Sequence, residues 1–469
     1  MEPRAGTPTL GAAANAFLWL RDVHLVCRRT HLNPTYLGRA KRLHSKGKTL
    51  VMKKQKISRR ELLKNSAALG LAATLPLSSV GLAGCSSKNA RSGNADGWQE
   101  LPVPAPLGSL TPRVSARPGG NALLSWLEPN ENGTASFRFS HWEQHNWSQP
   151  VTIAEGRLFS RDRASAPGVT ALSTQNLIAY WSQKPVPIES AGNAIELYMA
   201  ASTDAGAHWG SPILVNRSSA QTGEDNAYAS AAALDESRAT LIWLDGRNWD
   251  KQKRVQLMSR TVRPDGTMNE ATLLDPDTCT CCSTALVSTG SGLLAAYRGH
   301  TPGNIRDISS VRTAGAGWSQ PRIFHPDQWH IEACPVNGPH LDSDRDRAAL
   351  IWFTAPQDQP TVQLAFSQNG GTDFAPPLRI DSGRAMGRAQ VVLLPGNSAF
   401  AFWLEIESGT ARILARRIHN HAALDAPFEL SRGANLGYPH AVRTGDDILL
   451  AWAEKGAVSR VRVGILSAG

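Results

Sequence analysis

The sequence has few long hydrophobic runs, although 41% of its 469 residues are hydrophobic. Only one apolar run, within residues 67–84, approaches the 18 or so residues that a membrane-spanning helix needs. The chain is therefore not a polytopic membrane protein. With 19% charged residues and 14 Trp it is also too apolar and too aromatic for a disordered protein.

The main part of the chain also lacks an excess of basic residues, despite a net charge of +10. Residues 1–84 hold 15 Lys and Arg against three acidic residues, a net charge of +12, which leaves 34 basic and 36 acidic residues, a net of −2, for the rest. A nucleic-acid-binding protein carries its basic residues on the folded domain. We therefore expect no nucleic-acid partner.

Residues 52–84 resemble a twin-arginine lipoprotein signal peptide. Ser58–Lys64 reads SRRELLK and is similar to a twin-arginine export motif, and Leu82–Cys85 reads LAGC and is similar to a lipobox. The resemblance implies that Cys85 is lipidated. It also implies that the mature protein is held at a membrane by this lipid anchor, on the periplasmic or extracellular side of the cell envelope.

The remaining N-terminal segments have no predicted fold. Residues 85–97 are rich in Ser, Asn and Gly, as expected of a flexible tether. Residues 1–51 are unassigned, and Met52 is a candidate for the true start. The folded domain is expected over residues 98–469, as a monomer.

A repeat of 49 to 62 residues runs through this domain. Seven short β-rich runs each end in an aromatic residue. This period suits the four-stranded blades of a β-propeller. The seven aromatic residues are Trp126, Trp181, Trp243, Tyr297, Trp352, Trp403 and Trp452.

A second pattern, such as WSQPVTI from Trp147, recurs 21 to 28 residues after the first and predicts an outermost strand. The seventh blade lacks this strand at the C-terminus, and Trp98–Val103 can supply it and close the ring. We predict an all-β fold, a single propeller with seven blades, or six if one blade is irregular.

Two turns carry a known motif. Ser202–Trp209 matches the Asp-box pattern S-x-D-x-G-x-x-W, and Ser367–Phe374 is a variant with Asn and Phe. The chain therefore resembles the sialidase-like, Asp-box superfamily over most of residues 98–469. Sialidases use an arginine triad for the substrate carboxylate, a tyrosine nucleophile paired with an acid, and an Asp acid/base. The resemblance implies an acidic glycan as ligand and glycoside hydrolysis if the protein is an enzyme.

Candidate site residues lie in the loops on the face of the ring that usually binds ligands. Guanidinium groups suit an anionic ligand and carboxylates suit acid/base catalysis, although each arginine could equally form salt bridges between blades. The substrate-binding candidates are Arg113, Arg163, Arg247, Arg298, Arg306 and Arg388. The catalytic candidates are Asp245, Asp307, Glu405 and Tyr438, with Tyr228 as a second position for a nucleophile.

Four cysteines also fall in these loops. Cys279 and Cys334 each lie 18 residues before a blade aromatic, so they occupy equivalent places in adjacent blades, and Cys281 and Cys282 follow Cys279. Three interpretations stay open: two disulfides joining the blades, a site for copper or zinc completed by a histidine such as His440, or a redox-active thiol.

The sequence thus leaves three hypotheses for the function. The first is an exported propeller that binds or hydrolyses an acidic glycan at an arginine-rich mouth. The second is a metal-binding or redox propeller centred on the cysteines. The third is a non-catalytic scaffold of the cell envelope.

Overall fold

The computed structural model describes residues 97–185, 194–216, 225–315 and 317–468. The predicted signal peptide, the tether and Cys85 lie outside these residues. No helix among the described residues is long and apolar enough to cross a membrane. The short helices within the described ranges are η1 (Arg163–Ser165), α2 (Trp249–Gln252) and η3 (Pro356–Asp358).

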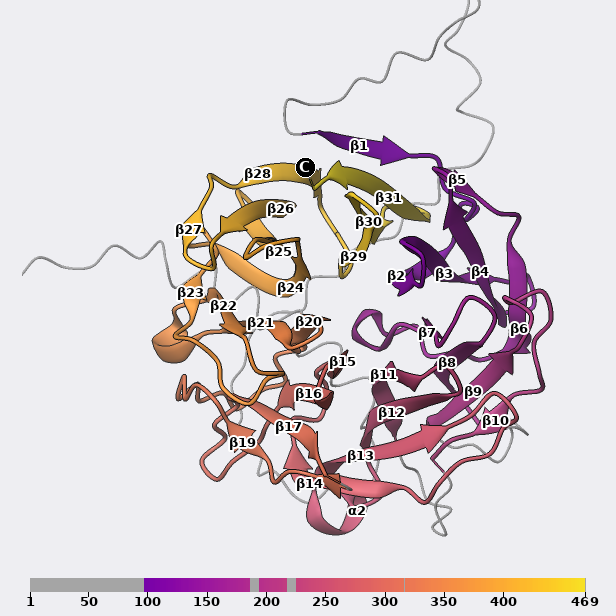
Figure 1. Ribbon diagram of the computed structural model, residues 1–469, viewed down its shortest axis with the longest axis horizontal. Coiled ribbons are helices and arrows are strands. Elements are labelled where there is room, and N and C mark those ends of the chain that lie inside the picture. The colour runs from indigo at the N-terminus through magenta and orange to yellow at the C-terminus, as the bar shows by residue number, and fades with distance from the viewer. Residues whose placement is uncertain (1–96, 186–193, 217–224, 316, 469) are drawn as a thin grey trace, which may run out of the picture. The chain divides into compact units, whose positions relative to one another are not determined.

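The described residues form seven antiparallel sheets of at least four strands, arranged in a ring (Figure 1). The first three blades run from the innermost strand outward. Blade one contains β2 (Leu110–Arg117), β3 (Asn121–Pro129), β4 (Ala135–Glu143), β5 (Asn146–Trp147) and β6 (Val151–Arg157). Blade two contains β7 (Gly168–Ala171), β8 (Leu177–Gln183), β9 (Glu196–Ser202) and β10 (Ile213–Leu214). Blade three contains β11 (Asn226–Asp235), β12 (Arg238–Asp245), β13 (Val255–Val262) and β14 (Thr272–Thr278).

The other four blades follow the same order. Blade four contains β15 (Ala285–Thr289), β16 (Gly292–Arg298), β17 (Ile308–Ala314), β18 (Gly317–Trp318) and β19 (Arg322–Ile323). Blade five contains β20 (His340–Asp344), β21 (Arg347–Thr354), β22 (Thr361–Ser367) and β23 (Leu378–Arg379). Blade six contains β24 (Ala385–Leu393), β25 (Ala399–Glu407), β26 (Thr410–His419), β27 (Ala423–Leu424) and β28 (Phe428–Gly433). Blade seven contains β29 (His440–Thr444), β30 (Asp447–Lys455), β31 (Ser459–Ser467) and β1 (Trp98–Leu101).

The seven-bladed propeller is therefore confirmed, and the six-bladed alternative is wrong. The innermost strands β2, β7, β11, β15, β20, β24 and β29 contact one another in sequence around the ring, and β29 contacts β2 to complete it. Every blade aromatic predicted from the repeat lies on the second strand of its blade and is at most 1% exposed. These side chains fill the space between neighbouring sheets, so burial of the repeated residue makes each blade pack on the next.

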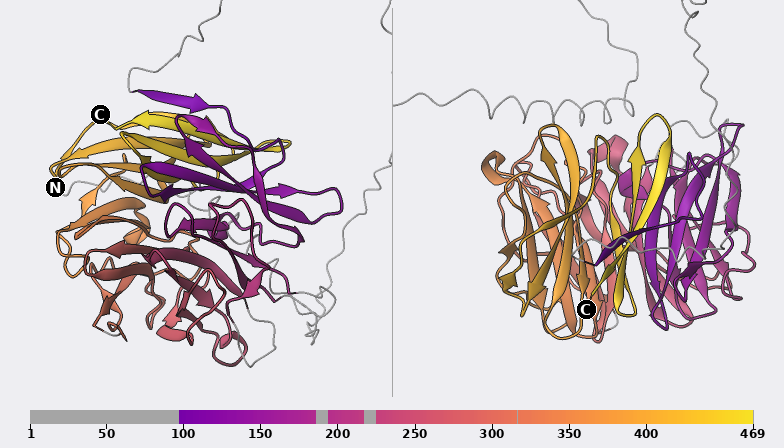
Figure 2. Two further views of the ribbon diagram at one scale, coloured as in Figure 1. Left: turned by 45° about the vertical axis from the view of Figure 1, so that its right-hand side comes forward. Right: turned by 90° about the horizontal axis from the view of Figure 1, so that it is seen from above.

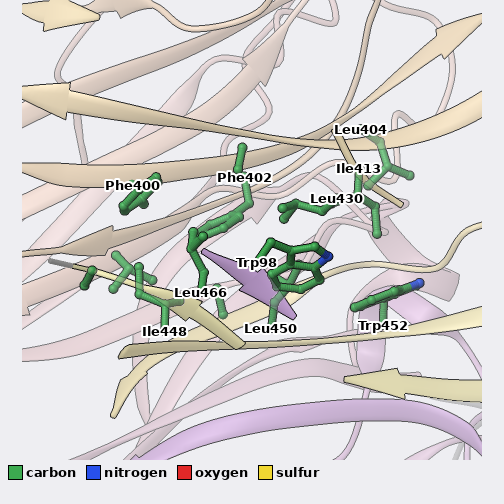
Figure 3. Close-up of a cluster of buried hydrophobic side chains, with 14 of the residues drawn as sticks. Trp98, Phe400, Phe402, Leu404, Ile413, Leu430, Ile448, Leu450, Trp452 and Leu466 are labelled. Carbon is green, nitrogen blue, oxygen red and sulfur yellow. The ribbon is translucent and has the colours of Figure 1, made fainter. Parts of the chain in front are cut away.

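The N-terminal strand closes the ring as the sequence predicts. β1 pairs antiparallel with β31, Trp98 opposite Leu466 (Figures 1 and 2). The Trp98 ring packs against Trp452 and Phe402 in the core between blades six and seven (Figure 3). A Cβ atom at Gly464 would lie 2.0 Å from the Trp98 ring, so only glycine fits beneath it. β1 thus supplies the outermost strand of blade seven.

The two turns singled out by the sequence form the same hydrogen bonds. In the first, Ser202 Oγ accepts from the backbone N–H of Gly206 at 2.8 Å, and Asp204 Oδ1 accepts from that of His208 at 2.9 Å. In the second, Ser367 Oγ accepts from Gly371 at 3.0 Å and Asn369 Oδ1 from Asp373 at 2.9 Å. Both turns thus stabilise their own backbone, and neither contributes to the centre of the ring.

Candidate functional site

The three carboxylates predicted as acid/base groups are buried. Asp245 has no exposed area, and its carboxylate accepts the indole N–H of Trp243 at 3.1 Å and two bonds from Arg247 at 2.7 Å. Asp307, 2% exposed, accepts the backbone N–H groups of Gln328 and Trp329 at 3.0 Å. Both carboxylates therefore hold loops and strands in place.

Glu405 belongs to the same group. It is 1% exposed, and its Oε1 accepts from the indole of Trp403 at 2.9 Å and from the backbone N–H of Ser382 at 2.7 Å. Its second oxygen lies 3.5 Å from Arg412. With these partners Glu405 acts as a structural hydrogen-bond acceptor.

Two of the predicted ligand-binding arginines are equally engaged. Arg298 is 1% exposed and donates to the backbone carbonyls of Asn337, Arg306 and Phe353, with its guanidinium 4.8 Å from the centre of the Trp329 ring. Arg247 forms the bidentate pair with Asp245. Arg298 connects blades four and five through backbone carbonyls, and the pair between Arg247 and Asp245 lies within blade three. Neither of these contacts is the salt bridge between blades that the alternative interpretation expects. Arg306 is half-buried next to this group.

Other predicted residues do meet at the centre of the ring. Tyr438, in blade seven, donates its hydroxyl to the carbonyl of Val336 in the loop before blade five, and the guanidinium of Arg388 lies 4.8 Å from the Tyr438 ring centre. Arg163, before blade two, donates to Oδ1 of Asn435, before blade seven, at 2.8 Å. Each hydrogen bond skips a blade, which is geometrically feasible only near the axis.

We call this cluster the central mouth. Its third side is formed by Tyr228, whose hydroxyl donates to Oδ2 of Asp162 at 2.8 Å. Asp162 caps η1 by accepting the backbone N–H of Ala164 at 2.9 Å. The central mouth comprises Asp162, Arg163, Tyr228, Val336, Arg388, Asn435 and Tyr438.

Backbone bulges project two of these side chains. Tyr228 and Arg388 lie within strands β11 and β24, each at a shift in register, with φ angles of +58° and +54°. The preceding blade fixes each bulge: Ser165 Oγ accepts the N–H of Tyr228 at 2.9 Å, and Asn337 Oδ1 accepts that of Arg388 at 2.7 Å. A left-handed conformation costs about 1–3 kcal/mol for a residue other than glycine and is common where a side chain serves a site.

The two arginines of the central mouth share one electrostatic environment. Burial, and then the positive charge of Arg388, lower the pKa of Arg163, although the nearby charges of Tyr438 and Asp162 act in the opposite sense. Among the described residues neither arginine forms an ion pair within 4.0 Å; Arg388 donates to the carbonyl of Leu436 at 3.0 Å. Two partly buried cations therefore lie close together with only neutral hydrogen-bond acceptors.

The two tyrosines of the central mouth are held in their neutral form. Burial raises the pKa of Tyr438, and burial together with the charge of Asp162 raises the pKa of Tyr228 well above its usual value. Each hydroxyl is a hydrogen-bond donor in the structure, and Asp162 is the group that can accept the proton of Tyr228.

Arg113 and His440 lie elsewhere in the ring. Arg113 is on β2, 5.7 Å from the centre of the Tyr180 ring, and His440 begins β29. Burial, and then the charges of Arg113 and His340, lower the pKa of His440 well below its usual value. Among the described residues, one group of His, Cys, Asp or Glu side chains has the spacing of metal ligands, and it consists of Cys279, Cys281 and Cys282. His440 is not part of this group.

The cysteines adopt a mixed arrangement. Cys281 and Cys334 form a disulfide between the loops of blades four and five, with Cα atoms 6.2 Å apart. Cys279 and Cys282 are buried free thiols whose sulfur atoms are 3.4 Å apart. The cluster packs against Tyr228 and Val336, so it borders the central mouth. With Cys281 in a disulfide, the cluster offers two thiolates rather than the four of an all-thiolate metal site.

Sequence reasoning missed Asp162 and Asn435. Both stand in entering loops, Asp162 directly before Arg163, but an isolated Asp or Asn in a loop carries no pattern of its own. Only the hydrogen bonds to Tyr228 and Arg163 show that they complete the central mouth.

No family model matches the sequence, and the search of curated proteins found no similar sequence. Among solved structures, the BP39L lectin from Burkholderia pseudomallei aligns with a TM-score of 0.53 at 13% identity, over 78% of this chain and 98% of the lectin. Trypanosoma rangeli sialidase in complex with the inhibitor DANA aligns with a TM-score of 0.43 at 11% identity, over 72% of this chain and 57% of the sialidase. Penicillium chrysogenum alpha-L-arabinanase complexed with arabinobiose aligns with a TM-score of 0.42 at 12% identity, over 77% of this chain and 94% of the arabinanase. At these identities the likeness concerns the propeller fold alone.

Proposed function

We propose that this propeller binds an acidic glycan at the central mouth, where the arginines contact the carboxylate group of the glycan. One observation carries the proposal: Arg163 and Arg388 are partly buried, close enough for the charge of one to lower the pKa of the other, and have only neutral acceptors. Of the two cations, Arg163 has the charge of Asp162 nearby, and that carboxylate also accepts the hydroxyl of Tyr228. Partly buried charges that are not fully compensated are unfavourable. A carboxylate that accepts from both guanidinium groups removes this cost.

A glycan is the favoured carrier of that carboxylate. The BP39L lectin shares the fold, and the hydroxyl groups of sugars bond to amides such as that of the exposed Asn435. Tyr438 is buried, so its ring supports Arg388 from within the site. The resemblance of the two turns to Asp boxes points to the same ligand class.

Calorimetric titration tests the proposal. Sialyllactose and an oligosaccharide containing glucuronate are the acidic ligands, and lactose is the neutral control. We expect Arg163→Met and Arg388→Met each to weaken binding of an acidic ligand about 10- to 100-fold, the equivalent of one charge-assisted hydrogen bond. Arg384→Met is the matched control, because Arg384 is exposed and pairs with Glu407 away from the centre. The proposal fails if neither acidic ligand binds, or if all three variants bind alike.

Glycoside hydrolysis is the second candidate function, favoured by the contact between Tyr228 and Asp162. A tyrosine can act as nucleophile when an adjacent carboxylate accepts its proton. In this scheme Asp162 takes the role that sequence reasoning gave to the buried carboxylates. Release of methylumbelliferone from its sialic acid and glucuronic acid conjugates measures the activity, and Tyr228→Phe should abolish it while leaving binding intact. Absence of release by the wild-type protein would leave binding as the function.

We further propose that the protein acts outside the cytoplasm on a lipid anchor at Cys85, exported by the twin-arginine route. The residues Ser58–Lys64 and Leu82–Cys85 support this proposal by their resemblance to the two signals. Cys85→Ser should shift the protein from the membrane fraction to the soluble fraction. Substitution of Arg59 and Arg60 by Lys should retain it in the cytoplasm, and unchanged fractionation of both variants would contradict the proposal.

A further inference from the structure

The four cysteines beside the central mouth form two pairs in contact with each other, one oxidised and one reduced. We propose that they form an intramolecular thiol–disulfide exchange site, in which one disulfide moves between the positions Cys281–Cys334 and Cys279–Cys282. This proposal is independent of glycan binding, because it concerns the cysteines and not the arginines of the central mouth.

The distances favour exchange. The sulfur atoms of Cys279 and Cys282 are 3.4 Å apart, and those of Cys279, Cys281 and Cys282 all lie within 4.8 Å of one another. A thiolate exchanges with a disulfide by direct attack on one sulfur atom, and a separation of at most 4.8 Å leaves Cys279 only a short movement from Cys281. The spacing Cys279-x-x-Cys282 also leaves the two residues free to form a disulfide with each other.

Chain geometry selects Cys279 as the attacking group. Cys282 is the direct neighbour of Cys281, and Cα atoms joined by a trans peptide are about 3.8 Å apart, which is shorter than the 4.4–6.8 Å that a disulfide usually spans. A bond from Cys282 to Cys281 is therefore disfavoured, whereas Cys279 is two residues away.

The exchange has two steps and needs no external oxidant. First, the Cys279 thiolate attacks Sγ of Cys281, and the bond between Cys281 and Cys334 breaks with its electron pair on Cys334. Second, the Cys282 thiolate attacks Sγ of Cys279, and Cys281 leaves as a thiolate. Two thiols lose their protons and two thiolates gain them, so the protein as a whole is neither oxidised nor reduced.

The product exposes a thiol where the starting state has none. Cys279 and Cys282 are 1% and 2% exposed, whereas Cys334 is half-buried and lies two residues before Val336, which accepts the hydroxyl of Tyr438. Cys281 stays buried at 7% exposed, so exchange places one thiol, that of Cys334, at the edge of the central mouth.

Two single variants of the full-length protein test the proposal. Cys282→Ser removes the resolving thiol, so we expect a trapped Cys279–Cys281 disulfide and a Cys334 that N-ethylmaleimide labels. Cys279→Ser is the matched control, in which Cys281–Cys334 should persist and Cys334 should stay unlabelled. Peptide mass mapping of protein labelled under anaerobic conditions identifies each cysteine. Equal labelling of Cys334 in the two variants, whether high or low, overturns the proposal.

The wild-type protein provides a second measurement that does not depend on the folding of a variant. After incubation in a glutathione redox buffer and quenching in acid, both the Cys281–Cys334 and the Cys279–Cys282 disulfides should be found, each in molecules that carry the other pair as thiols. Finding only the Cys281–Cys334 disulfide at every ratio of reduced to oxidised glutathione overturns the proposal. Four reduced cysteines holding zinc or copper in the purified protein also overturn it.

Discussion

Trp403 donates its indole N–H to Oε1 of Glu405, 2.9 Å away and two residues further along β25. Trp243 bonds in the same way to Asp245 at 3.1 Å, and Trp181 to Gln183 at 2.6 Å. The position two residues after a blade tryptophan is therefore a buried acceptor in three blades. This repeated role explains why two carboxylates that the sequence marks as catalytic candidates are structural.

Replacing Glu405 should destabilise the protein. Glu405→Ala leaves the indole of Trp403 and the N–H of Ser382 without an acceptor, so we expect the free energy of unfolding to fall by about 3–5 kcal/mol. Glu405→Gln keeps an acceptor oxygen, so its free energy of unfolding should fall by less. Urea unfolding measures both. Asp373→Ala, at an exposed pair with Arg322, is the control and should change little. A stable Glu405→Ala protein that had lost glycan turnover would restore Glu405 as a catalytic residue.

The contributions of the ring and of the hydroxyl of Tyr438 can be separated by two substitutions. Tyr438→Phe removes the hydrogen bond to Val336 and keeps the ring beside Arg388, so it should cost about 1 kcal/mol of stability and leave acidic ligand binding within about threefold. Tyr438→Ala also removes the contact that positions Arg388 and should weaken binding at least tenfold. Calorimetric titration with sialyllactose checks this. Equal binding by the two variants would show that the ring does not position Arg388.

The disulfide should contribute measurably to stability. Cys281 and Cys334 are separated by 53 residues, and removal of a cross-link over a loop of this length costs about 2–4 kcal/mol. Cys281→Ala with Cys334→Ala should therefore lower the urea midpoint, and a reductant should lower that of the wild-type protein but not that of the double variant. A midpoint that reductant does not change in the wild-type protein would contradict a disulfide at this position.

The contribution of His340 to stability should fall as the pH is lowered from 6.5 to 3. Burial, and then the charge of Arg113, lower the pKa of His340 to about 3, and its Nδ1 accepts the N–H of Val391 at 3.2 Å. Between pH 3 and 6.5 the unfolded chain therefore binds a proton at this ring that the folded protein does not, and the free energy of unfolding rises with pH. His340→Asn should reduce the slope of the free energy of unfolding against pH by the equivalent of up to one bound proton. Urea unfolding at several pH values measures this slope. An unchanged slope would contradict the assignment.

Asp342, on the same strand, should act in the opposite direction. Burial raises the pKa of its carboxyl group to about 6, although the backbone N–H groups of Leu393 and Ser343 donate to it. Between pH 4 and 6 the folded protein binds the extra proton, so this group lowers stability as the pH rises. Asp342→Asn should make the slope of stability against pH more positive in this range, and a slope that became less positive would contradict it.

The fold could be predicted well from the sequence, and the site only in part. A propeller repeats one local unit, so the aromatic residue that ends each second strand is visible as a period, and so is the missing outer strand that Trp98–Leu101 supplies. The site has no such period. Its residues come from different blades, and Arg163 and Asn435 are 272 positions apart in the chain.

The sequence by itself predicted seven blades, with six as the alternative, the closure of the ring and the neighbouring positions of the cysteine loops, because strand patterning and repeat spacing are local properties. Only the tertiary structure decided which polar side chains are structural and which meet at the axis. Asp245, Glu405 and Arg298 are hydrogen-bonded within and between blades, whereas Arg163 and Arg388 form no ion pair within 4.0 Å in the part of the chain that the structure describes. Burial and hydrogen bonding depend on neighbours that are distant in sequence, and so they exist only once the ring has closed.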